Sequence, residues 1–356
     1  MTTKTRYSRQ SVLPEIGTQG QSRIAKASVL CIGAGGLGCP ALLYLAAAGV
    51  GRIGIVDFDV VDETNLQRQV LFTLDQIGEN KALAAKARLE ALNPEIRIDA
   101  YAEELTEKNA PDLLTRYDIV IDGTDNFPAK FLINDAALKT GKAFIYGSIL
   151  GFKGQLAVFG HNGGPCYRCL FPEAPKGHIP NCAEAGVIGA VAGMIGTAQA
   201  MEALKIIVGG ESFKPLSGKL WTVDMRSMEN TLLGLSKNPD CPACSKAKEE
   251  ITLQYASPVC GFVAEITPQQ IRMQNDARLL VDVRELDEWN SGHIEGAHHT
   301  PLSALMRGDI PDLPTDRQVI LYCQKGMRSL QAAQILKTHG YLNISSMAGG
   351  YEAWCA

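Results

Sequence analysis

The feature that most constrains the fold of this chain is a glycine-rich stretch, CIGAGGLG, at residues 31–38. It lies between a β-rich run at 27–33 and a helical run at 41–49, and a second apolar run follows at 52–59. Strand, glycine turn, helix and strand in this order are typical of a βαβ unit. The sequence therefore predicts that the chain begins with a parallel sheet that carries a phosphate-binding turn.

Three glycines of this stretch, Gly33, Gly35 and Gly38, have the spacing G-x-G-x-x-G. Such glycines permit a tight turn and let phosphate oxygens approach the backbone at the N-terminus of a helix. Asp57 ends the second strand, where a carboxylate can hold a ribose hydroxyl. By itself this pattern favours NAD or FAD as much as ATP, and a turn that only allows close helix packing is the alternative without a ligand.

The alternation of strands and helices continues after this unit and predicts an α/β fold with a mostly parallel, doubly wound sheet. A charged stretch, SKAKEE, and then ASPVCG separate this region from a second, smaller α/β pattern. We therefore expect two domains, residues 1–257 and 258–356. The further elements predicted in the first domain are helices near 80–92 and 186–208 and strands near 96–101, 118–122, 143–148, 155–160 and 219–224.

The charge of the chain argues against some classes of partner. A formal net charge of -4 provides no basic excess for a phosphate backbone, so we do not expect nucleic acid to bind. The start of the chain has no signal-peptide pattern, and the longest apolar stretch, GVIGAVAGMIGTA, ends at polar residues, which favours a buried helix and no membrane span. We expect a cytoplasmic protein, in which cysteines more often bind metal or do chemistry than form disulfides.

A second set of side chains supplies charges suited to a triphosphate. Asn65 and Arg68 follow the second strand, Lys81 begins a helix, and the segment DGTDN places Asp125 and Asn126 after another strand. An anionic polyphosphate needs cations, and Mg²⁺ prefers oxygen ligands. These groups favour ATP with Mg²⁺ over a nicotinamide cofactor. Ordinary surface ion pairs are the alternative for each charged residue taken singly.

Several longer motifs resemble the MoeB/ThiF family, the ubiquitin-activating-enzyme-type adenylyltransferases of sulfur-carrier proteins, over roughly residues 5–250. They are RYSRQ, GAGGLG, DFDVVDETNLQRQ, DGTDN and CAEAGV. The resemblance implies a Rossmann-like adenylation domain that transfers AMP from ATP to the C-terminal glycine of a ubiquitin-like carrier ending in Gly-Gly. It also implies a homodimer, because Arg9 matches an arginine that reaches into the partner's ATP site. The nucleotide-binding residues so implied are Gly33, Gly35, Gly36, Gly38, Asp57, Asn65, Arg68, Lys81, Asp125 and Asn126, with Asp125 on magnesium.

The cysteines of the first domain fall into three groups. Cys166 and Cys169, and Cys241 and Cys244, form two C-x-x-C pairs, a spacing at which four thiolates can hold one Zn²⁺ tetrahedrally. Redox pairs or plain buried thiols are the alternatives. Cys182 matches a reactive cysteine of the family, with an incidental loop thiol as the alternative. Two further cysteines beside the glycine loop are expected in the core.

The second domain resembles a single rhodanese domain over about residues 262–356. The motifs that carry this resemblance are VDVRELDEWNSGHIEGAHHTPL, YCQKGMRS and MAGGYEAW. Cys323 lies between a strand and a helix, with Lys325 and Arg328 nearby, surroundings that favour a thiolate or a persulfide anion. Cys323 and Arg328 enclose a loop one residue shorter than that of related phosphatases, which favours sulfur over phosphate. An inactive docking fold is the alternative. His293, His298 and His299 are expected to cap or pack the loop and not to form a metal cluster.

Together these features resemble proteins in which a carrier adenylyltransferase is fused to a rhodanese. The hypothesis is that Cys323 receives sulfur from a cysteine desulfurase or thiosulfate and that its persulfide attacks the acyl adenylate. Cys182 would then resolve an acyl disulfide to give a carrier thiocarboxylate for molybdopterin, thiamine, cysteine or tRNA thiolation. The rivals are an NAD-dependent oxidoreductase with a rhodanese appendage and a zinc-stabilised scaffold without turnover.

Overall fold

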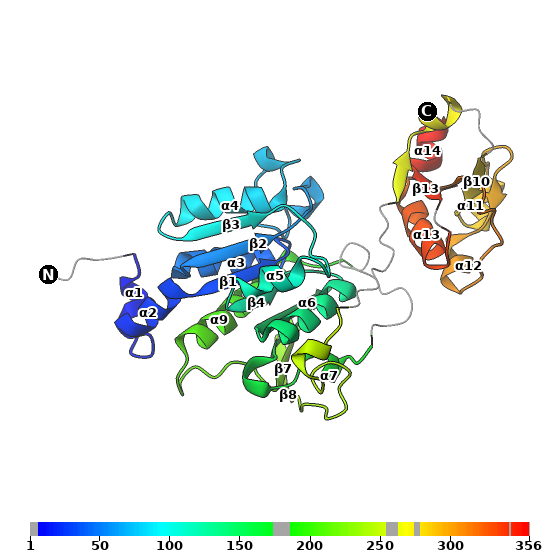
Figure 1. Cartoon of the computed structure of the whole chain (residues 1–356). Coiled ribbons are helices and arrows are strands. Elements are labelled where there is room, and N and C mark those ends of the chain that lie inside the picture. Colours follow the sequence, from blue (N-terminus) through cyan, green and yellow to red (C-terminus); the bar gives the residue numbers. More distant parts are fainter. Residues whose placement is uncertain (1–5, 174–185, 254–262, 274–277, 342, 356) are drawn as a thin grey trace. The chain divides into compact units, whose positions relative to one another are not determined.

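The computed structural model describes residues 6–173, 186–253, 263–273, 278–341 and 343–355. The chain divides into two compact units, residues 1–255 and 256–356 (Figure 1). Each unit has its own sheet and its own hydrophobic core. The predicted boundary between residues 257 and 258 falls in the segment 254–262, outside the described residues.

The first unit is built on an eight-stranded sheet with the order β3-β2-β1-β4-β5-β6-β7-β8. The pairs from β3 to β5 are parallel, and those from β5 to β8 are antiparallel. The parallel half has the strand order of a doubly wound nucleotide-binding fold, so the predicted fold class is confirmed. The strands are β1 (Ser28–Ile32), β2 (Arg52–Val56), β3 (Arg97–Tyr101), β4 (Ile119–Asp122), β5 (Ala143–Leu150), β6 (Lys153–Phe159), β7 (Lys219–Asp224) and β8 (Glu229–Gly234).

Helices cover both faces of this sheet because its buried strands are apolar on both sides. Along β1, Val29 and Cys31 pack with residues of α3, α4 and α9, whereas Leu30 and Ile32 pack with residues of α5 and α6. The expectation that Cys31 and Cys39 belong to the core is confirmed, since neither is exposed. The helices are α1 (Ser8–Ser11), α2 (Gly17–Lys26), α3 (Gly38–Ala48), α4 (Lys81–Leu92), α5 (Ala110–Thr115), α6 (Phe127–Thr140), α7 (Tyr167–Leu170) and α9 (Gly189–Val208), with 3-10 turns at Glu63–Asn65, Leu74–Gln76, His161–Gly163 and Lys248–Glu250.

Local sequence signals fix the ends of the helices that matter for function. Asn80 caps α4 by accepting hydrogen bonds from the backbone N–H groups of Ala82 and Leu83. Asn126 caps α6 in the same way through the N–H of Ala129, at 2.9 Å. The first residues of α4 and α6 are thereby held at the carboxyl-terminal edge of the parallel strands, where doubly wound folds bind ligands.

Helix α9 is the long apolar helix of the first unit. It is long and apolar enough to cross a membrane by length and composition, but half of its most apolar window is buried within the fold. Gln199 is fully buried and donates hydrogen bonds to the carbonyls of Asp122 and Ile145. These contacts make α9 a core helix that packs on α3 and on the sheet.

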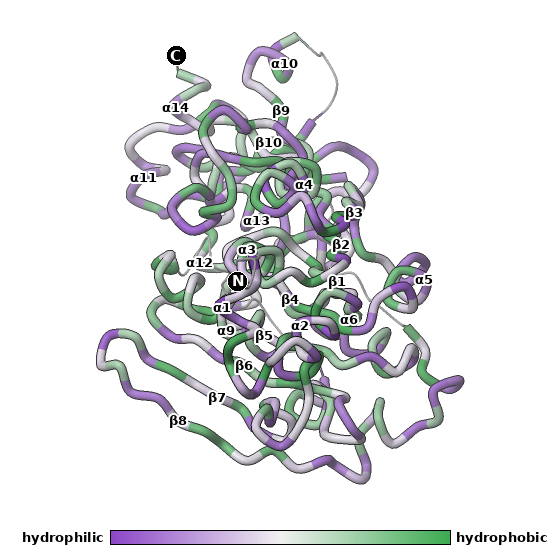
Figure 2. The backbone as a smooth tube through the Cα atoms, turned by 90° about the vertical axis from the view of Figure 1, so that its left-hand side faces the viewer, coloured by the Kyte–Doolittle hydropathy of each residue, from purple (hydrophilic) through white to green (hydrophobic). Residues whose placement is uncertain are grey.

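Strand β8 has no counterpart among the predicted elements. It pairs along its whole length with β7, and the two form a hairpin (Figure 2). All of its side chains are exposed, including Leu232 and Leu233. A strand without a buried face has no alternation of apolar and polar residues, which is the signal that predicts most strands.

The second unit has a five-stranded, all-parallel sheet with the order β11-β10-β12-β13-β9. Val281 and Leu321 lie on the side that packs with Leu336 of α13, and Tyr322 packs on the opposite side. The strands are β9 (Ala264–Ile266), β10 (Leu279–Asp282), β11 (His298–His299), β12 (Val319–Tyr322) and β13 (Ile344–Met347), and the helices are α10 (Pro268–Met273), α11 (Leu286–Asn290), α12 (Leu302–Met306), α13 (Met327–Thr338) and α14 (Gly350–Cys355).

Candidate active sites

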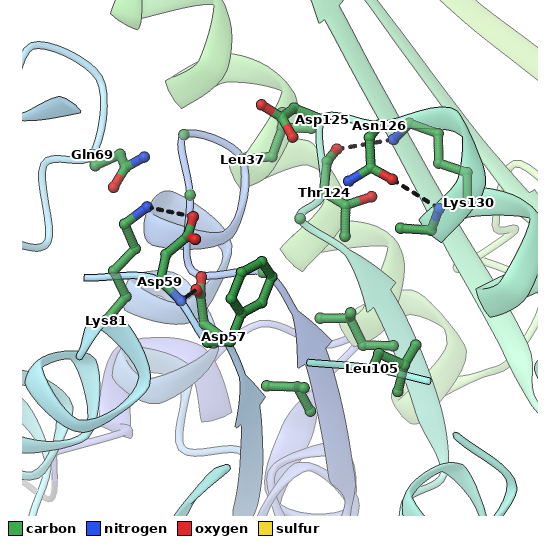
Figure 3. A pocket seen from close by; sticks show the side chains of 18 of the residues that line it. Leu37, Asp57, Asp59, Gln69, Lys81, Leu105, Thr124, Asp125, Asn126 and Lys130 are labelled. Atoms are coloured by element: carbon green, nitrogen blue, oxygen red, sulfur yellow. Dashed lines mark hydrogen bonds and ion pairs between the residues drawn. The ribbon is translucent and has the colours of Figure 1, made fainter. Parts of the chain in front are cut away.

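A pocket of about 310 Å³ lies where the loops after β1, β2 and β4 meet. This volume is in the range of small-molecule sites in proteins. Figure 3 shows Lys81 and Asp59 on one side of the pocket and Thr124, Asp125 and Lys130 on the other. The lining includes nine of the ten predicted nucleotide residues, namely Gly33, Gly35, Gly36, Asp57, Asn65, Arg68, Lys81, Asp125 and Asn126.

The glycine loop is held against the neighbouring loop without room for side chains. Gly33 has a φ of +91°, and a Cβ there would lie 2.8 Å from the backbone of Gly123. Gly38 does not line the pocket among the described residues, because it lies behind the loop. A Cβ on Gly38 would lie 2.0 Å from the carbonyl oxygen of Gly33, so this glycine allows α3 to pack under the turn.

Asp57 fixes the backbone of two segments at the floor of the pocket. Its carboxylate accepts hydrogen bonds from the backbone N–H of Ala34 at 2.7 Å and from that of Asp59 at 2.9 Å. Burial raises the pKa of the Asp57 carboxyl, while the Ala34 hydrogen bond opposes this shift. The predicted ribose contact of Asp57 would use the oxygen lone pairs that these two bonds leave open.

Lys81 supplies a positive charge that is largely withdrawn from solvent. Its side chain is 6% exposed, and Nζ lies 3.1 Å from the carboxylate of Asp59, which is half-exposed. Burial of the stem at the first turn of α4 directs the ammonium group into the pocket. A bound anion would therefore meet a cation that is already in place.

The segment after β2 contributes polar side chains to the pocket wall, and two of them are joined by a hydrogen bond. The Asn65 side-chain oxygen accepts a hydrogen bond from Nε2 of Gln69 at 2.7 Å. Among the described residues, the Arg68 guanidinium makes one hydrogen bond, to the carbonyl of Thr64 at 3.4 Å, so most of its donors have no protein partner there. These free donors suit a phosphate.

Asp125 lies at the pocket beside a tightly held lysine. Lys130 is buried, and its Nζ donates to Asp122 Oδ2 at 2.5 Å and to the carbonyls of Thr124 and Gly147 at 3.0 and 2.9 Å. These bonds fix the loop that presents Asp125 (Figure 3). The Asp125 carboxylate is an oxygen ligand of the kind that Mg²⁺ prefers.

Lys130 and Gln69 line the pocket but were not among the predicted site residues. The signal for Lys130 was its spacing, since it follows the helix cap Asn126 by about one turn on the same side of α6. Arg9 lies exposed on α1 and is not in the lining, so one copy of the described chain does not bring it to this pocket. Cys182 lies outside the described residues.

The two C-x-x-C pairs come together as the spacing predicts. The four Sγ atoms of Cys166, Cys169, Cys241 and Cys244 lie within 4.8 Å of one another, with closest pairs at 3.4 and 3.5 Å. Tetrahedral zinc with Zn–S bonds of about 2.3 Å requires sulfurs roughly 3.8 Å apart, so the donor set fits this ion. Burial raises the pKa of the Cys166 thiol and raises that of Cys244 to about 12. Such thiols ionise when a cation is bound.

Cys323 lies at the carboxyl end of β12 in a closed loop. It is 1% exposed, and its Sγ accepts a hydrogen bond from the backbone N–H of Gly326 at 3.1 Å. The hydroxyl of Ser329 lies 3.6 Å from the same sulfur and 2.8 Å from the hydroxyl of Ser346. These donors converge on one atom and suit a thiolate or a persulfide anion.

Arg328 lies at the other end of this loop and is engaged by an acid. Its guanidinium donates to both carboxylate oxygens of Glu288, at 2.7 and 2.6 Å. Glu288 is on α11, so the ion pair ties the loop to the preceding segment of the sequence. The Arg328 hydrogen bond lowers the pKa of Glu288. Arg328 therefore shapes the loop, and its pKa is raised first by the hydrogen bond to Glu288 and further by the Cys323 thiolate.

The closing motif of the chain completes this site. The N–H of Tyr351 donates to the carbonyl of Cys323 at 2.7 Å, and a Cβ on Gly350 would lie 2.3 Å from that same oxygen. His293 and His299 stack on Trp289, with ring centroids 3.6 and 4.8 Å away. This contact agrees with the prediction that His293 and His299 have a packing role.

Known proteins with similar sequences assign the two sites to a family. Residues 7–243 match the ThiF family. The probable adenylyltransferase/sulfurtransferase MoeZ of Mycobacterium tuberculosis is 42% identical to this chain, and the match covers 98% of this chain and 92% of MoeZ. The chain belongs to the ThiF family. Residues 268–356 match the rhodanese-like domain, so this ThiF-family chain joins an adenylyltransferase to a sulfurtransferase.

Other relatives support the ThiF assignment for the first unit. The sulfur carrier protein adenylyltransferase of Thermus thermophilus is 48% identical over 72% of this chain and 96% of its own length. The crystal structure of E. coli MccB with ATP has a TM-score of 0.58, covers 68% of this chain and 75% of that chain, and is 22% identical. This last likeness shows the fold alone. The matches do not support the alternative of an NAD-dependent oxidoreductase.

Proposed function

We propose that this ThiF-family chain uses ATP and Mg²⁺ to adenylate the C-terminal glycine of a ubiquitin-like sulfur-carrier protein. One observation carries the proposal: a single pocket brings together a glycine loop, the cations of Arg68 and Lys81, and the carboxylate of Asp125. The glycine backbone and the cations suit phosphates, and Asp125 suits the magnesium ion. A carrier ending in Gly-Gly is the substrate that fits the family.

In the first step a carboxylate oxygen of the carrier attacks the α-phosphorus of ATP. The bond from this phosphorus to the bridging oxygen breaks, and pyrophosphate leaves with its electron pair. Arg68 and Lys81 lie where they offset the negative charge of the triphosphate. Bound Mg²⁺ would neutralise phosphate charge, with Asp125 as its protein ligand. The product is an acyl adenylate, whose carbonyl is open to a nucleophile.

In the second step the nucleophile is sulfur on Cys323. A donor such as a cysteine desulfurase or thiosulfate leaves sulfane sulfur on this cysteine as a persulfide. The terminal sulfur attacks the carrier carbonyl, AMP leaves, and an acyl disulfide joins the carrier to Cys323. A second thiolate, which we assign to Cys182, then attacks the Cys323 sulfur. This releases the carrier thiocarboxylate and leaves a Cys182–Cys323 disulfide for a cellular dithiol to reduce.

Three further features belong to the proposal. The four cysteines at 166, 169, 241 and 244 hold a structural zinc ion, supported by the fit of their sulfur spacing. Two chains form a homodimer, in which the partner supplies Arg9 to the pocket. The exposed Val12 and Leu13, close to Arg9 in sequence, supply apolar surface for such a contact. The protein acts in the cytoplasm, a reducing compartment in which structural disulfides are rare and a catalytic disulfide is reduced again.

Mass spectrometry of carriers tests this function directly. The full chain is mixed with ATP, Mg²⁺ and a panel of ubiquitin-like carriers ending in Gly-Gly, with and without thiosulfate. We expect pyrophosphate release and, with thiosulfate and a reductant, a carrier whose mass reflects exchange of one oxygen for sulfur. Binding of carriers without any pyrophosphate release would favour the scaffold alternative instead.

A further inference from the structure

The residues between the first two metal-binding cysteines contact a helix that leads to the ATP pocket. Cys166 and Cys169 flank Tyr167 and Arg168 on the short helix α7. Both intervening residues bond to α6, one through its side chain and one through its backbone. A metal site that only stabilises its own loop would not require these contacts with α6.

Arg168 is bound to α6 by a two-pronged ion pair. Its Nε and Nη2 donate to the carboxylate of Asp135 at 2.9 and 2.7 Å. The Asp135 side chain is 7% exposed, and the guanidinium also stacks over the ring of Phe131 at 4.6 Å. A largely buried, bidentate pair of this geometry fixes both the direction and the distance between α7 and α6.

Tyr167 makes the second connection. Its backbone N–H donates to Oδ1 of Asn134 at 2.8 Å. Its ring is fully buried and packs on Phe131 of α6 and on Tyr146 of β5, with centroids 5.0 and 5.3 Å away. Its hydroxyl has no hydrogen-bond partner among the described residues, so ring packing and the backbone bond hold this residue.

The same side of α6 carries the pocket lysine. Lys130 precedes Asn134 by four residues, about one helical turn, and its Nζ lies over the ring of Tyr146 at 5.2 Å. Lys130 in turn bonds Asp122 and the carbonyl of Thr124, next to Asp125. A continuous set of contacts therefore runs from the cysteines through α7 and α6 to the loop that presents Asp125.

We propose that Arg168 is a positioning residue for the nucleotide pocket. Through Arg168, the metal-bound cysteines fix the position of α6. A metal ion at the cysteines holds α7, Arg168 and Tyr167 hold α6, and α6 holds Lys130 and the Asp125 loop. The metal site is then part of the adenylation machinery as well as of the fold. This inference rests on the proposed use of ATP with Mg²⁺ in the pocket and of a metal ion at the cysteines.

The main test is the variant Arg168→Lys in the full chain. Lysine keeps the charge but cannot form the bidentate fork or the flat stack on Phe131. The dissociation constant of α,β-methylene ATP with Mg²⁺ is measured by calorimetry, and the KM for ATP by pyrophosphate exchange, with zinc content determined in parallel. The matched control is Arg97→Met, which removes a surface ion pair to Asp99 on β3.

We expect Arg168→Lys to raise the dissociation constant and the KM for ATP roughly 2- to 30-fold while zinc content and kcat change little. Arg97→Met leaves both constants unchanged. If Arg168→Lys is poorly folded, the pair Arg168→Met with Asp135→Leu replaces it, because that pair leaves no buried charge unpartnered. A lower thermal midpoint with unchanged nucleotide constants would make Arg168 merely structural and overturn the proposal.

Removal of the metal ion provides a second test of the same proposal. Chelated wild-type protein that is still folded by circular dichroism should lose nucleotide affinity to a similar degree as Arg168→Lys. Chelation of the variant should add little, because the two changes interrupt one set of contacts. Fully additive losses would contradict the coupling. Failure of the wild-type protein to bind the ATP analogue at all would instead refute the proposed adenylation function.

Discussion

The ATP pocket and the Cys323 loop occupy the same position in two different sheets, at the carboxyl ends of parallel strands. They differ in how much space this position leaves. The pocket of the first unit measures about 310 Å³ and is lined by loops after several strands. In the second unit a single loop closes around a sulfur atom that is almost entirely buried. The same edge of a sheet thus serves a nucleotide when its loops diverge and a single sulfur atom when one loop closes.

The charged and polar groups of the two sites also differ in how widely they are spread. The pocket distributes Lys81, Arg68 and Asp125 over its walls, as a ligand with several charged groups requires. The loop instead directs one backbone N–H and one hydroxyl to one atom, and neutralises Arg328 with Glu288. This difference predicts that changes in one unit leave the chemistry of the other intact.

The largest effect is expected from loss of the sulfur atom itself. The variant Cys323→Ala should lower formation of carrier thiocarboxylate by at least about 10³-fold, because it removes the sulfur that carries the persulfide in the proposed mechanism. Mass spectrometry of the carrier measures this loss, whereas pyrophosphate exchange, measured as incorporation of labelled pyrophosphate into ATP, should persist. Cys355→Ala, which removes an exposed cysteine of the same unit, is the control and should not alter the thiocarboxylate yield. If Cys323→Ala also lost pyrophosphate exchange, the two sites would not act independently, which would contradict this comparison.

A change in the pocket should have the reverse pattern. Lys81→Met removes a buried cation and should slow pyrophosphate exchange by about 10²- to 10³-fold, as loss of one charge-stabilising donor does in other enzymes. Transfer of sulfur from thiosulfate to cyanide should be unchanged. Lys86→Met on the same helix removes only an exposed i,i+4 pair with Glu90 and serves as the control. Equal rates for the two variants would show that Lys81 does not act on ATP.

Metal removal should separate the units by stability. An ion present at a thousand times its dissociation constant stabilises the folded state by about 4 kcal/mol. Chelation should therefore lower the melting temperature of the first unit by roughly 8–16 °C, measured by calorimetry, and leave the second unit unchanged. Cys241→Ser should give the same shift without chelator. A single transition that shifts as a whole would show instead that the two units unfold together.

The smallest effect concerns the ion pair at the Cys323 loop. The Arg328 hydrogen bond lowers the pKa of Glu288 below its ordinary value of 4.5, so the pair stabilises the second unit above that pH. The contribution is lost as the pH falls through the lowered pKa of the folded state. Glu288→Gln should cost about 1 kcal/mol or less at pH 7 and progressively less toward pH 4, measured by urea unfolding. Glu295→Gln, at an exposed position, is the control, and a pH-independent difference would count against the ion pair.

Much of this fold was open to prediction from sequence because its signals are local. The glycine spacing, the alternating apolar runs and the paired cysteines each specify a turn, a strand or a ligand within a few residues. Strand β7 coincides with its prediction, and the four cysteines come within 4.8 Å as their spacing predicts. Strand β8 was missed because its exposed side chains leave no periodic signal.

What only the tertiary structure decided is which distant residues act together. Sequence identified Asp125 and Lys81 from their motifs, but the role of Lys130 depends on bonds to three groups in two separate segments, the end of β4 with its loop and strand β5. In the same way, the contact of Arg168 with Asp135 joins residues 33 positions apart. Sequence patterns encode local geometry, whereas packing of one helix on another sets such long-range pairs, so their partners emerge only when the chain has folded.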